Sequence, residues 1–468
     1  MTLIKSISGI RGTIGGAPGT NLTPVDVLKF TLAFGTWVKS DSGKNKIVIG
    51  RDARVSGQMV SNIVVGALQS IGIDVLDLGL STTPTVEFAV ANEKAGGGII
   101  ITASHNPKQW NALKLLNSKG EFISAAAGEQ ILKAADNVFT DFKEVNALGS
   151  YATALDYIDK HIEHILKLKL VDTDAIKARK FRIAIDCVNS TGGIAVPKLL
   201  RALGVEEVIE LYTEPNGLFP HNPEPLPEHL HELASTVKKK KADLGISVDP
   251  DVDRLALVCE DGNMFGEEYT LVAVADYVLS SLPAGKAGKK GITVSNLSST
   301  RALRDVTEKR GGIYHAAAVG EVNVVEKMKE VKAVIGGEGN GGVIYPESHY
   351  GRDALVGIAL FLSHLAKFGK SASLLRASYP NYHISKKKID LDASVNMDNL
   401  FEQIQKKYKK YPINTIDGVK IEFDKDWVHL RRSNTEPIIR IYAESNSETT
   451  ADNIAEQIMA DLREFSKG

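Results

Sequence analysis

The sequence predicts three related mixed α/β domains, each containing a βαβ unit, followed by a smaller C-terminal α+β domain. Three observations predict this fold class. The chain has 468 residues, and at roughly 150 residues per domain this length corresponds to about three domains, or four if one is small. A strand–helix–strand plan recurs three times along the chain, and the pattern changes after Gly369.

The three repeats share one order of elements. Each begins with basic residues and a short apolar strand, continues through a polar loop into an amphipathic helix, and closes with glycine before a second apolar strand. They run over residues 46–78, 182–211 and 291–316. This order and spacing predict βαβ units with mainly parallel pairing. Because a recurring plan indicates repetition of a structural unit, we expect three related domains.

The last part of the chain has a different pattern. A helix is expected over residues 398–410, and alternating strands near 419–423 and 427–430. The joints between the earlier domains are expected around 151–177, which is helical and polar, and around 260–268. We therefore expect domains at residues 1–150, 151–258, 259–370 and 371–468.

Composition and charge exclude several classes of partner. Lys plus Arg number 56 and Asp plus Glu number 57, so the net charge of −1 argues against nucleic acid or an anionic membrane. Apolar stretches such as 356–362 are far shorter than the about 20 residues of a membrane-spanning helix, and the N-terminus lacks a secretory signal. Cys187 and Cys259 lie inside apolar runs, which makes a disulfide framework unexpected. We expect a cytoplasmic protein.

The first chemical motif is a polar loop after an apolar strand at residues 98–102. Pro107 stops a helix from including Asn106, so Ser104 is presented at a strand end, where α/β folds place their chemistry. A serine needs a base, a metal or a stored high-energy group to act as a nucleophile. His105 and Lys114 can supply proton transfer or charge. The alternative is a plain hydrogen-bonded turn.

The second motif places Asp249, Asp251 and Asp253 at alternating positions after an apolar strand. Three carboxylates this close need a cation, because like charges oppose joint ionisation. A hard divalent ion with oxygen ligands, Mg²⁺ above all, meets that need. An EF-hand begins similarly, but Arg254 stands where its glycine is required. The remaining alternative is a solvated acidic turn.

Two further loops offer ligand-binding groups. Glycines surround Glu338 and Asn340, which suggests backbone close to a ligand and side chains that bind hydroxyls; a plain glycine-rich turn is the alternative. Near the C-terminus, guanidinium, hydroxyl and amide groups gather in one turn at Arg431, Ser433, Asn434 and Thr435, as in a phosphate-binding loop; the alternative is a charged hairpin turn. A presented serine, a metal triplet, a hydroxyl-binding loop and a phosphate loop together favour phosphoryl transfer on a sugar phosphate.

These motifs resemble those of the α-D-phosphohexomutase superfamily, over essentially the full length of the chain. Residues 102–107 match its phosphoserine loop, and Lys114 falls on the Asn-Gly-x-Lys element that follows, with Ala112 in place of Gly. The aspartate triplet matches its metal loop, with Pro250 in place of Gly. Residues 337–342 align with its sugar loop Gly-Glu-x-Ser-Gly-His, and residues 431–437 match its phosphate loop. The resemblance implies three α/β domains and a smaller fourth around a central cleft.

Two departures from the sugar loop bear on the chemistry. Asn340 replaces the family's serine, and Gly342 replaces its histidine. The second change removes the family's histidine from proton transfer, so the residue that acts as general acid or base is left open. The form of this loop is similar to archaeal-type phosphoglucosamine and phosphohexomutase sequences, which favours glucosamine phosphate, with glucose or mannose phosphate as the alternative.

The resemblance also implies a mechanism and its components. Phosphorylated Ser104, bridged to one Mg²⁺ held by the aspartate triplet, would donate its phosphoryl group to a hexose phosphate, and a hexose 1,6-bisphosphate intermediate would return the other one. We expect Lys114, His105 and Arg11 near the transferred group and Arg254 beside the metal loop. Glu338 and Asn340 would contact the sugar, and the residues expected to bind the phosphate that does not react are Arg431, Ser433, Asn434 and Thr435.

The alternatives to a mutase are a phosphohydrolase and a non-catalytic sugar-phosphate-binding protein. Aspartate-nucleophile phosphatases need Asp-x-Asp-x-Thr/Val, which residues 251–255 do not provide. A Ser104-dependent hydrolase would require water as the phosphoryl acceptor. A non-catalytic sugar-phosphate-binding homologue would typically have lost Ser104 or a carboxylate, and neither is missing. We expect a hexose phosphate as the partner, and a monomer or homodimer.

Overall fold

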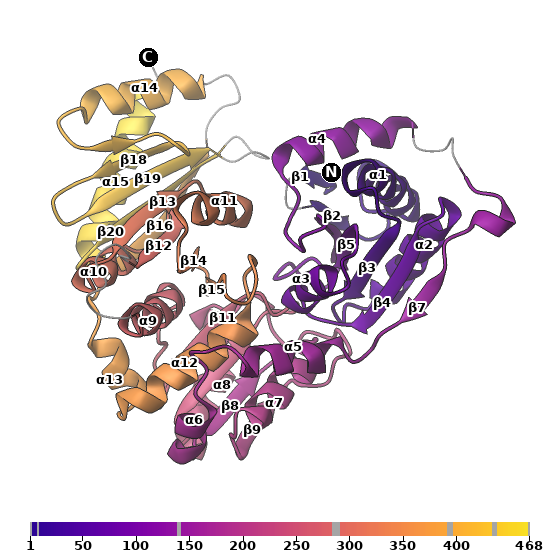
Figure 1. Cartoon of the computed structure of the whole chain (residues 1–468). Coiled ribbons are helices and arrows are strands. Elements are labelled where there is room, and N and C mark those ends of the chain that lie inside the picture. The colour runs from indigo at the N-terminus through magenta and orange to yellow at the C-terminus, as the bar shows by residue number, and fades with distance from the viewer. Residues whose placement is uncertain are drawn as a thin grey trace. The chain divides into compact units, whose positions relative to one another are not determined.

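The computed structural model describes residues 2–6, 9–137, 142–282, 291–390, 396–432 and 438–466 (Figure 1). The chain forms two compact units. The first contains Met1–Ser281 and Asn340–Arg376, and the second contains Leu282–Gly339 and Ala377–Gly468. Within the described ranges, no helix combines the length and the apolar character needed to cross a bilayer. Cys187 and Cys259 are both buried and form no disulfide.

A seven-stranded mixed sheet opens the first unit, in the order β1-β2-β6-β5-β3-β4-β7. β3 pairs in parallel with β4 and β5, whereas β6 is antiparallel to β5 and β2. The strands are β1 (Ile4–Ser6), β2 (Gly9–Thr13), β3 (Lys46–Arg51), β4 (Asp74–Leu80), β5 (Gly97–Ile101), β6 (Trp110–Leu116) and β7 (Tyr151–Thr153). The helices are α1 (Pro24–Ser42), α2 (Gly57–Ser70), α3 (Thr83–Asn92) and α4 (Ala125–Ala134), with 3₁₀ turns at Ala135–Asn137 and Val145–Ala147.

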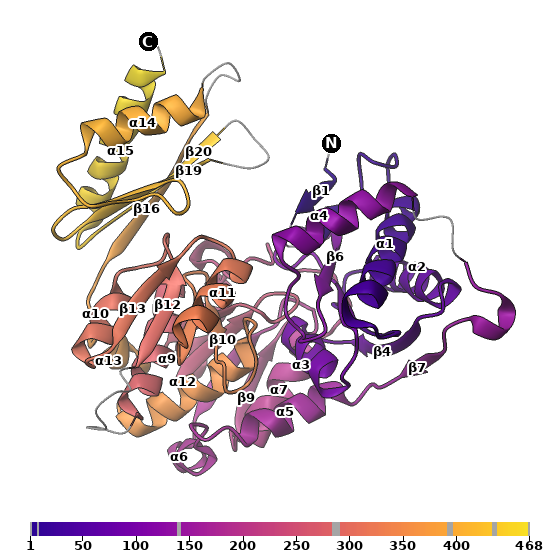
Figure 2. The same cartoon turned by 45° about the horizontal axis from the view of Figure 1, so that its top comes forward.

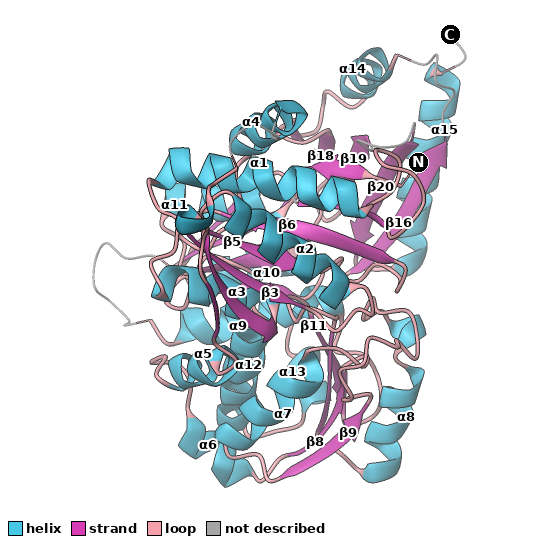
Figure 3. Cartoon of the chain, turned by 90° about the vertical axis from the view of Figure 1, so that its right-hand side faces the viewer, coloured by secondary structure: helices cyan, strands magenta, loops and turns pink. Residues whose placement is uncertain are grey.

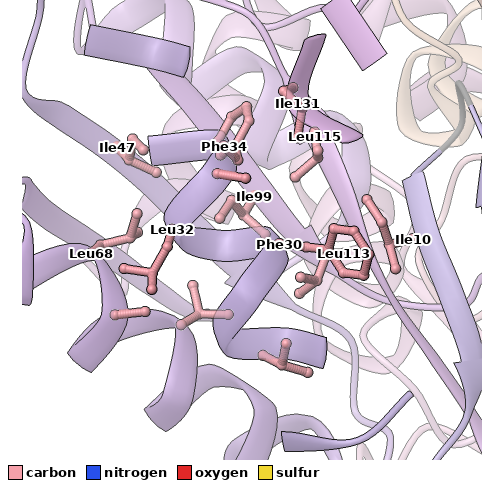
Figure 4. Close-up of a cluster of buried hydrophobic side chains, with 14 of the residues drawn as sticks. Ile10, Phe30, Leu32, Phe34, Ile47, Leu68, Ile99, Leu113, Leu115 and Ile131 are labelled. Carbon is pink, nitrogen blue, oxygen red and sulfur yellow. The ribbon is translucent and has the colours of Figure 1, made fainter. Parts of the chain in front are cut away.

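Helices cover both faces of this sheet, so its central strands are apolar throughout. On one face, Ile47 and Ile99 pack with Phe30 and Phe34 of α1 and Leu68 of α2 (Figure 4). The alternate residues of the same strands, such as Val48, pack against α3 on the other face. This core fixes the ends of β3 and β5, from which the polar loops of the site emerge.

The second sheet of the first unit has the order β11-β10-β8-β9. β8 pairs in parallel with β9 and β10, and β10 pairs antiparallel with β11. The strands are β8 (Arg182–Asp186), β9 (Glu207–Leu211), β10 (Leu244–Val248) and β11 (Leu255–Cys259). The other elements of this part are α5 (Tyr157–Leu166), α6 (Thr173–Arg179), α7 (Gly192–Ala202), a 3₁₀ turn (Pro227–His229), α8 (His231–Lys240), α9 (Glu267–Ser280), β15 (Gly342–Ile344), α12 (Ala354–Phe368) and α13 (Ala372–Ala377).

The second unit contains the parallel strands β13-β12-β14 and an antiparallel sheet in the order β16-β20-β19-β18-β17. α14 and α15 lie along the antiparallel sheet (Figure 2). Their apolar side chains form one buried cluster with those of its strands. The elements are β12 (Ile292–Asn296), α10 (Ala302–Lys309), β13 (Ile313–Ala317), α11 (Glu321–Val331), β14 (Ile335–Glu338), β16 (His383–Asp390), α14 (Met397–Lys407), β17 (Ile413–Asn414), β18 (Val419–Glu422), β19 (Trp427–Arg432), β20 (Ile438–Ser445) and α15 (Glu448–Phe465).

The three predicted βαβ units are confirmed. β3-α2-β4, β8-α7-β9 and β12-α10-β13 each bring two strands into parallel pairing. β8 and β9 lie side by side in Figure 3. The glycine after each helix has a positive φ: 74° at Gly72, 91° at Gly204 and 73° at Gly311. Glycine adopts this left-handed conformation without a steric penalty, so it ends the helix and turns the chain into the next strand.

Candidate active site

Ser104 follows β5 and is held at the end of that strand by its neighbours. Thr102 Oγ1 donates to Asp52 Oδ2 at 2.6 Å and accepts from the Ser104 amide at 2.9 Å. The backbone of Ser104 has φ 49°, a left-handed conformation that costs a non-glycine residue about 1–3 kcal/mol. Its side chain is mostly buried, and Oγ donates to Asp249 Oδ2 at 2.6 Å. The predicted loop therefore presents its hydroxyl to the predicted metal loop.

Arg54 braces the backbone of the serine loop. Its guanidinium donates to the carbonyl oxygens of Asn106 at 2.6 Å, Pro107 at 2.7 Å and Trp110 at 3.0 Å, and also to that of Ser104. Asp52 pairs with it at 3.0 Å and neutralises the buried charge. Sequence reasoning assigned Arg54 no role in the site; the signal available was a charged Asp-x-Arg pair directly after a buried strand.

The aspartate loop connects the antiparallel strands β10 and β11. Asp249, Asp251 and Asp253 are completely buried. Asp249 Oδ1 accepts from the amides of Asp253 and Arg254, both at 3.1 Å, which closes the loop on itself. Val252 has φ 63°, an uncommon backbone conformation for a β-branched residue. The loop is thus held in a strained shape that directs all three carboxylates to one place.

Several groups from distant parts of the chain contact these carboxylates. Lys114 Nζ lies 2.6 Å from Asp251 Oδ2 and 3.4 Å from Asp253 Oδ2. Thr83 Oγ1 donates to Asp251 Oδ2 at 2.6 Å. Arg352 Nη2 donates to Asp253 Oδ2 at 2.7 Å. Sequence reasoning placed Lys114 near the reacting group, but it missed Thr83 and Arg352, since no local pattern connects them with the aspartate loop.

The electrostatics of the triplet follow from burial and mutual repulsion. Burial and the charges of Asp251 and Asp253 raise the pKa of Asp249 well above its usual range. Burial acts on Asp251 in the same direction, but Lys114 overcomes it and holds the pKa of Asp251 below its usual range. Although burial opposes its charge, the two carboxylates raise the pKa of Lys114, which therefore stays cationic.

The residues of the triplet fit a divalent cation. One ligand oxygen from each aspartate lies within 4.8 Å of the others. Among the described residues, Asp251 Oδ1 and Asp253 Oδ1 are buried and have no hydrogen-bond partner. Buried carboxylate oxygens without donors are rare, and a hard cation with oxygen ligands satisfies them. The arrangement is therefore an acidic site capable of binding a metal beside the Ser104 hydroxyl.

His105 contacts Ser104, and both His105 and Arg254 lie near Glu224. His105 Nδ1 is 3.4 Å from Ser104 Oγ, and His105 Nε2 is 3.9 Å from Glu224 Oε1. Arg254 Nη1 contacts the same Glu224 oxygen at 3.1 Å. Burial, followed by the charge of Arg254, lowers the pKa of His105 to about 2, so the imidazole is neutral. Glu224 is a further residue that the sequence did not indicate.

Arg11 lies on β2, which is antiparallel to β6. Its cross-strand partner is Ala112, two residues before Lys114. Residues directly opposite, and residues two apart on one strand, share a face of a sheet. Arg11 and Lys114 therefore extend from the same face.

The residues after β14 include the two departures from the family's sugar loop. Asn340 Oδ1 accepts from the Gly342 amide at 3.2 Å. A Cβ atom built on Gly342 would lie 2.3 Å from Cδ of Arg352, so the arginine side chain occupies the space where the family's histidine would begin. Gly341 has φ 82°, and its carbonyl accepts from the Leu255 amide at 3.1 Å.

In the second unit, two predicted residues are held by one short loop. Glu338 Oε1 accepts from the Gly320 amide at 3.2 Å and from Asn296 at 3.0 Å. The adjacent amide of Val319 donates to Asp417 Oδ2 at 2.9 Å, and the same oxygen binds Arg431 Nε at 2.7 Å. Ser433, Asn434 and Thr435 lie outside the described residues.

Four sequence families match successive parts of the chain. They are described as phosphoglucomutase/phosphomannomutase alpha/beta/alpha domains I, II and III and the C-terminal domain, and they match residues 3–141, 159–262, 266–382 and 393–461. The domain boundaries expected from the sequence remain predictions.

Similar proteins agree with these matches. A phosphoglucomutase/phosphomannomutase of Thermococcus kodakarensis is 36% identical over 466 residues, covering 98% of this chain and 99% of the relative. A phosphoglucosamine/phosphogalactosamine mutase of Sulfurisphaera tokodaii is 34% identical over 459 residues, covering 96% and 97%. The crystal structure of a phosphoglucomutase/phosphomannomutase family protein from Burkholderia thailandensis is 27% identical, has a TM-score of 0.85 and covers 100% of this chain and 99% of its own. The chain belongs to the phosphoglucomutase/phosphomannomutase family and is a phosphohexomutase.

Proposed function

We propose that the chain is a phosphoglucosamine mutase that interconverts glucosamine 6-phosphate and glucosamine 1-phosphate through phosphorylated Ser104 and a bisphosphate intermediate. The observation that carries the phosphoserine is the 2.6 Å hydrogen bond from Ser104 Oγ to Asp249, beside Lys114 and the other two aspartates. The sugar is inferred from the form of the loop at 337–342 and from relatives such as the phosphoglucosamine/phosphogalactosamine mutase of S. tokodaii. A phosphoglucomutase/phosphomannomutase of broad specificity is the alternative, because another relative has that name.

In the proposed step, the bond between phosphorus and Ser104 Oγ breaks as a bond between phosphorus and a sugar hydroxyl oxygen forms. The sugar hydroxyl loses a proton, and Ser104 Oγ gains one. His105 Nδ1 lies 3.4 Å from that oxygen and is neutral, so it is positioned to relay this proton. Because its pKa is low, His105 would pass the proton on and would not remain protonated. The second transfer repeats these events in reverse with the other phosphoryl group of the bisphosphate.

The charged residues would stabilise the negative charge of the transferring phosphoryl group. Lys114, which remains cationic, would face the charge that develops on the transferring group, and Arg11 shares its face of the sheet. Ser104 and the aspartate triplet would hold one Mg²⁺, which when bound supplies positive charge for phosphoryl transfer.

The remaining residues are assigned to substrate binding. Arg254, Glu338 and Asn340 would contact the sugar or its phosphate. Arg431 with Ser433, Asn434 and Thr435 would bind the phosphate that does not react, because a guanidinium and several hydroxyl and amide donors suit a phosphate. The shared loop at Val319 and Gly320 connects Glu338 to Arg431 through Asp417. A change in phosphate binding at Arg431 would therefore also alter the position of Glu338, which would contact the sugar.

Intact-protein mass spectrometry tests the phosphoserine. The wild-type chain incubated with glucose 1,6-bisphosphate is expected to gain one phosphoryl group, and Ser104→Ala is expected to gain none. Ser40→Ala, an exposed serine on α1, is the matched control and should behave as wild type. An active Ser104→Ala enzyme would refute the mechanism.

A coupled assay tests the substrate. Glucosamine, glucose, mannose and N-acetylglucosamine phosphates are compared at fixed Mg²⁺ with trace bisphosphate, and glucosamine phosphate should give the highest kcat/KM. Equal rates would establish the broad-specificity alternative. Steady release of inorganic phosphate without transfer between positions 1 and 6 would instead identify a hydrolase.

A further inference from the structure

A second cluster of metal-ligating side chains lies in the first unit, apart from the aspartate triplet. It consists of His161 on α5, and of His349 and Asp353 just before α12. His161 is completely buried, Asp353 is 1% exposed, and the side chain of His349 is 11% exposed. The proposed phosphoryl transfer uses none of these three residues.

We propose that His161, His349 and Asp353 form a zinc-binding site. His161 Nε2 and His349 Nε2 each lie 3.1 Å from Asp353 Oδ2, and the three ligand atoms lie within 4.8 Å of one another. Ligands bound tetrahedrally to zinc at about 2.0–2.1 Å are about 3.3 Å apart. Two imidazoles and one carboxylate are a donor set that suits Zn²⁺.

The other ring nitrogens of the two histidines face polar groups of α3. His161 Nδ1 lies at hydrogen-bond distance from Thr85 Oγ1, 3.1 Å, whereas His349 Nδ1 lies 3.3 Å from Glu87 Oε2 without hydrogen-bonding geometry. A ligating histidine usually donates its other ring N–H to such an oxygen, which turns the free nitrogen toward the metal. Asp353 Oδ1 accepts two backbone amides at the start of α12, at 2.8 and 3.1 Å, and leaves Oδ2 facing the histidines.

Two buried ring nitrogens of the cluster, His161 Nε2 and His349 Nδ1, have no hydrogen-bond partner among the described residues. His161 Nε2 lies close to Asp353 Oδ2, yet among the described residues it has no partner in hydrogen-bonding geometry. A short distance between two ligand atoms without a hydrogen bond is compatible with both atoms binding a third centre; His349 Nε2, by contrast, forms a direct hydrogen bond with Asp353 Oδ2 at 3.1 Å. The lone pair of His161 Nε2 is then the natural donor to the metal.

Charge balance favours a dication. The side chains of Glu87 and Asp353 are each 1% exposed, so two negative charges are buried beside two histidines. Buried carboxylates need compensating charge nearby. One Zn²⁺ supplies both positive charges while the two histidines remain neutral; without a metal, a protonated His349, which lies 3.1 Å from Asp353 and 3.3 Å from Glu87, balances only one of them.

The segment before α12 passes close to Glu87 at a glycine. A Cβ atom built on Gly351 would lie 1.9 Å from Glu87 Oε2, so a side chain at this position would displace the carboxylate that lies beside His349. The next residue, Arg352, contacts Asp253 at 2.7 Å. The zinc site would thus connect α3, α5 and the start of α12, and would fix the position of an arginine beside the aspartate triplet.

Zinc titration of the purified full-length chain tests the proposal. The protein is first stripped with a chelator, and excess Mg²⁺ is present throughout to occupy the aspartate triplet. Wild type should bind one Zn²⁺ per chain and melt at a higher temperature with the ion. His349→Gln and His161→Gln should bind Zn²⁺ more than about 100-fold more weakly and show no rise in Tm.

The matched control is His364→Gln, which changes a buried histidine of α12 that lies near Asp276 and outside the cluster. It should bind Zn²⁺ as wild type does. Equal zinc affinity in wild type and His349→Gln would overturn the proposal, as would wild type that binds none. If the cluster variants do not fold, anomalous scattering at the zinc edge from wild-type crystals decides the question: a peak between His161 and His349 supports the site, and a peak only at the aspartate triplet refutes it.

Discussion

The side chain of Arg352 fills the space that a side chain at Gly342 would need. A Cβ atom on Gly342 would lie 2.3 Å from Arg352 Cδ, and the same arginine reaches Asp253 at 2.7 Å. A side chain at position 342, such as the histidine that the resemblance implies there, and the arginine in its present position therefore cannot both be accommodated. Arg352 brings its guanidinium to an aspartate of the predicted metal loop.

The first prediction follows from the crowding between position 342 and Arg352. Gly342→Ala should destabilise the chain by about 1–3 kcal/mol, because Arg352 must move out of a packed site, and kcat should fall as Asp253 loses its contact with Arg352. Denaturant unfolding and the mutase assay measure both effects. The double variant Gly342→Ala with Arg352→Ala should recover much of the stability but not the activity.

Gly66→Ala is the matched control for that substitution. Gly66 lies inside α2, and a Cβ atom there meets nothing within 4 Å. Because alanine favours a helix, this variant should gain up to about 1 kcal/mol. If Gly342→Ala were as stable as Gly66→Ala, the crowding by Arg352 would be disproved.

Lys114 competes with a metal for the same carboxylates. It lies 2.6 Å from Asp251 and stays cationic, so Lys114→Met should tighten Mg²⁺ binding by about tenfold or more, because a nearby positive charge is removed. The variant should nevertheless lose most of its kcat. Calorimetric titration with Mg²⁺ and the mutase assay separate the two effects. Lys108→Met, at an exposed position of the serine loop, should change neither; an unchanged Mg²⁺ affinity in Lys114→Met would contradict the prediction.

Arg54 is expected to be irreplaceable by lysine. Lysine has a single ammonium group, so it cannot reach the four carbonyl oxygens that the guanidinium contacts. Arg54→Lys should lower the free energy of unfolding by about 2–4 kcal/mol, measured by urea unfolding. Arg51→Lys, which loses one contact to the exposed Gln58, should cost much less. Similar losses in the two variants would show that the loop does not depend on Arg54.

His429 should make stability depend on pH. It is 1% exposed, and burial lowers its pKa to about 4. The unfolded chain, with a histidine pKa of about 6.5, binds more protons between these values, so stability falls by about 3 kcal/mol as pH drops from about 6.5 to about 4. In the fold, Ser298 Oγ lies 2.9 Å from Nδ1 and the Asp417 carbonyl lies 2.6 Å from Nε2.

The test compares unfolding free energies at pH 7.5 and pH 5. The wild type should lose more stability than His429→Gln over this interval, because the variant has no group to titrate there. His231→Gln, at an exposed position of α8, should follow the wild type. Parallel pH profiles for wild type and His429→Gln would rule out this source of acid sensitivity.

The features that could be predicted from the sequence are those whose signals lie within one short segment of the chain. The βαβ units follow from apolar strands, amphipathic helices and terminating glycines, and each of those signals lies within one short segment. The loops of Ser104 and of the aspartate triplet are likewise continuous in sequence, and the structure places the Ser104 hydroxyl against Asp249.

What could not be predicted depends on tertiary placement. Arg352 lies 99 residues from Asp253, and Thr83 lies 168 residues from Asp251, so neither pair leaves a pattern in the sequence. The antiparallel pairing of β6 with β2 and β5 is also long-range. His161 and His349 are each unremarkable alone, and only the packing of α5 beside the start of α12 brings them together.

The contacts of Arg54 have a consequence for repeated turnover. Its hydrogen bonds go to backbone carbonyl oxygens of the serine loop and not to Ser104 Oγ. These bonds are therefore the same whether the serine carries a hydroxyl or a phosphoryl group. In the proposed cycle, the serine would gain and lose its phosphoryl group while these bonds hold the main chain of the loop in place, so little reorganisation energy would be added to either half of the cycle.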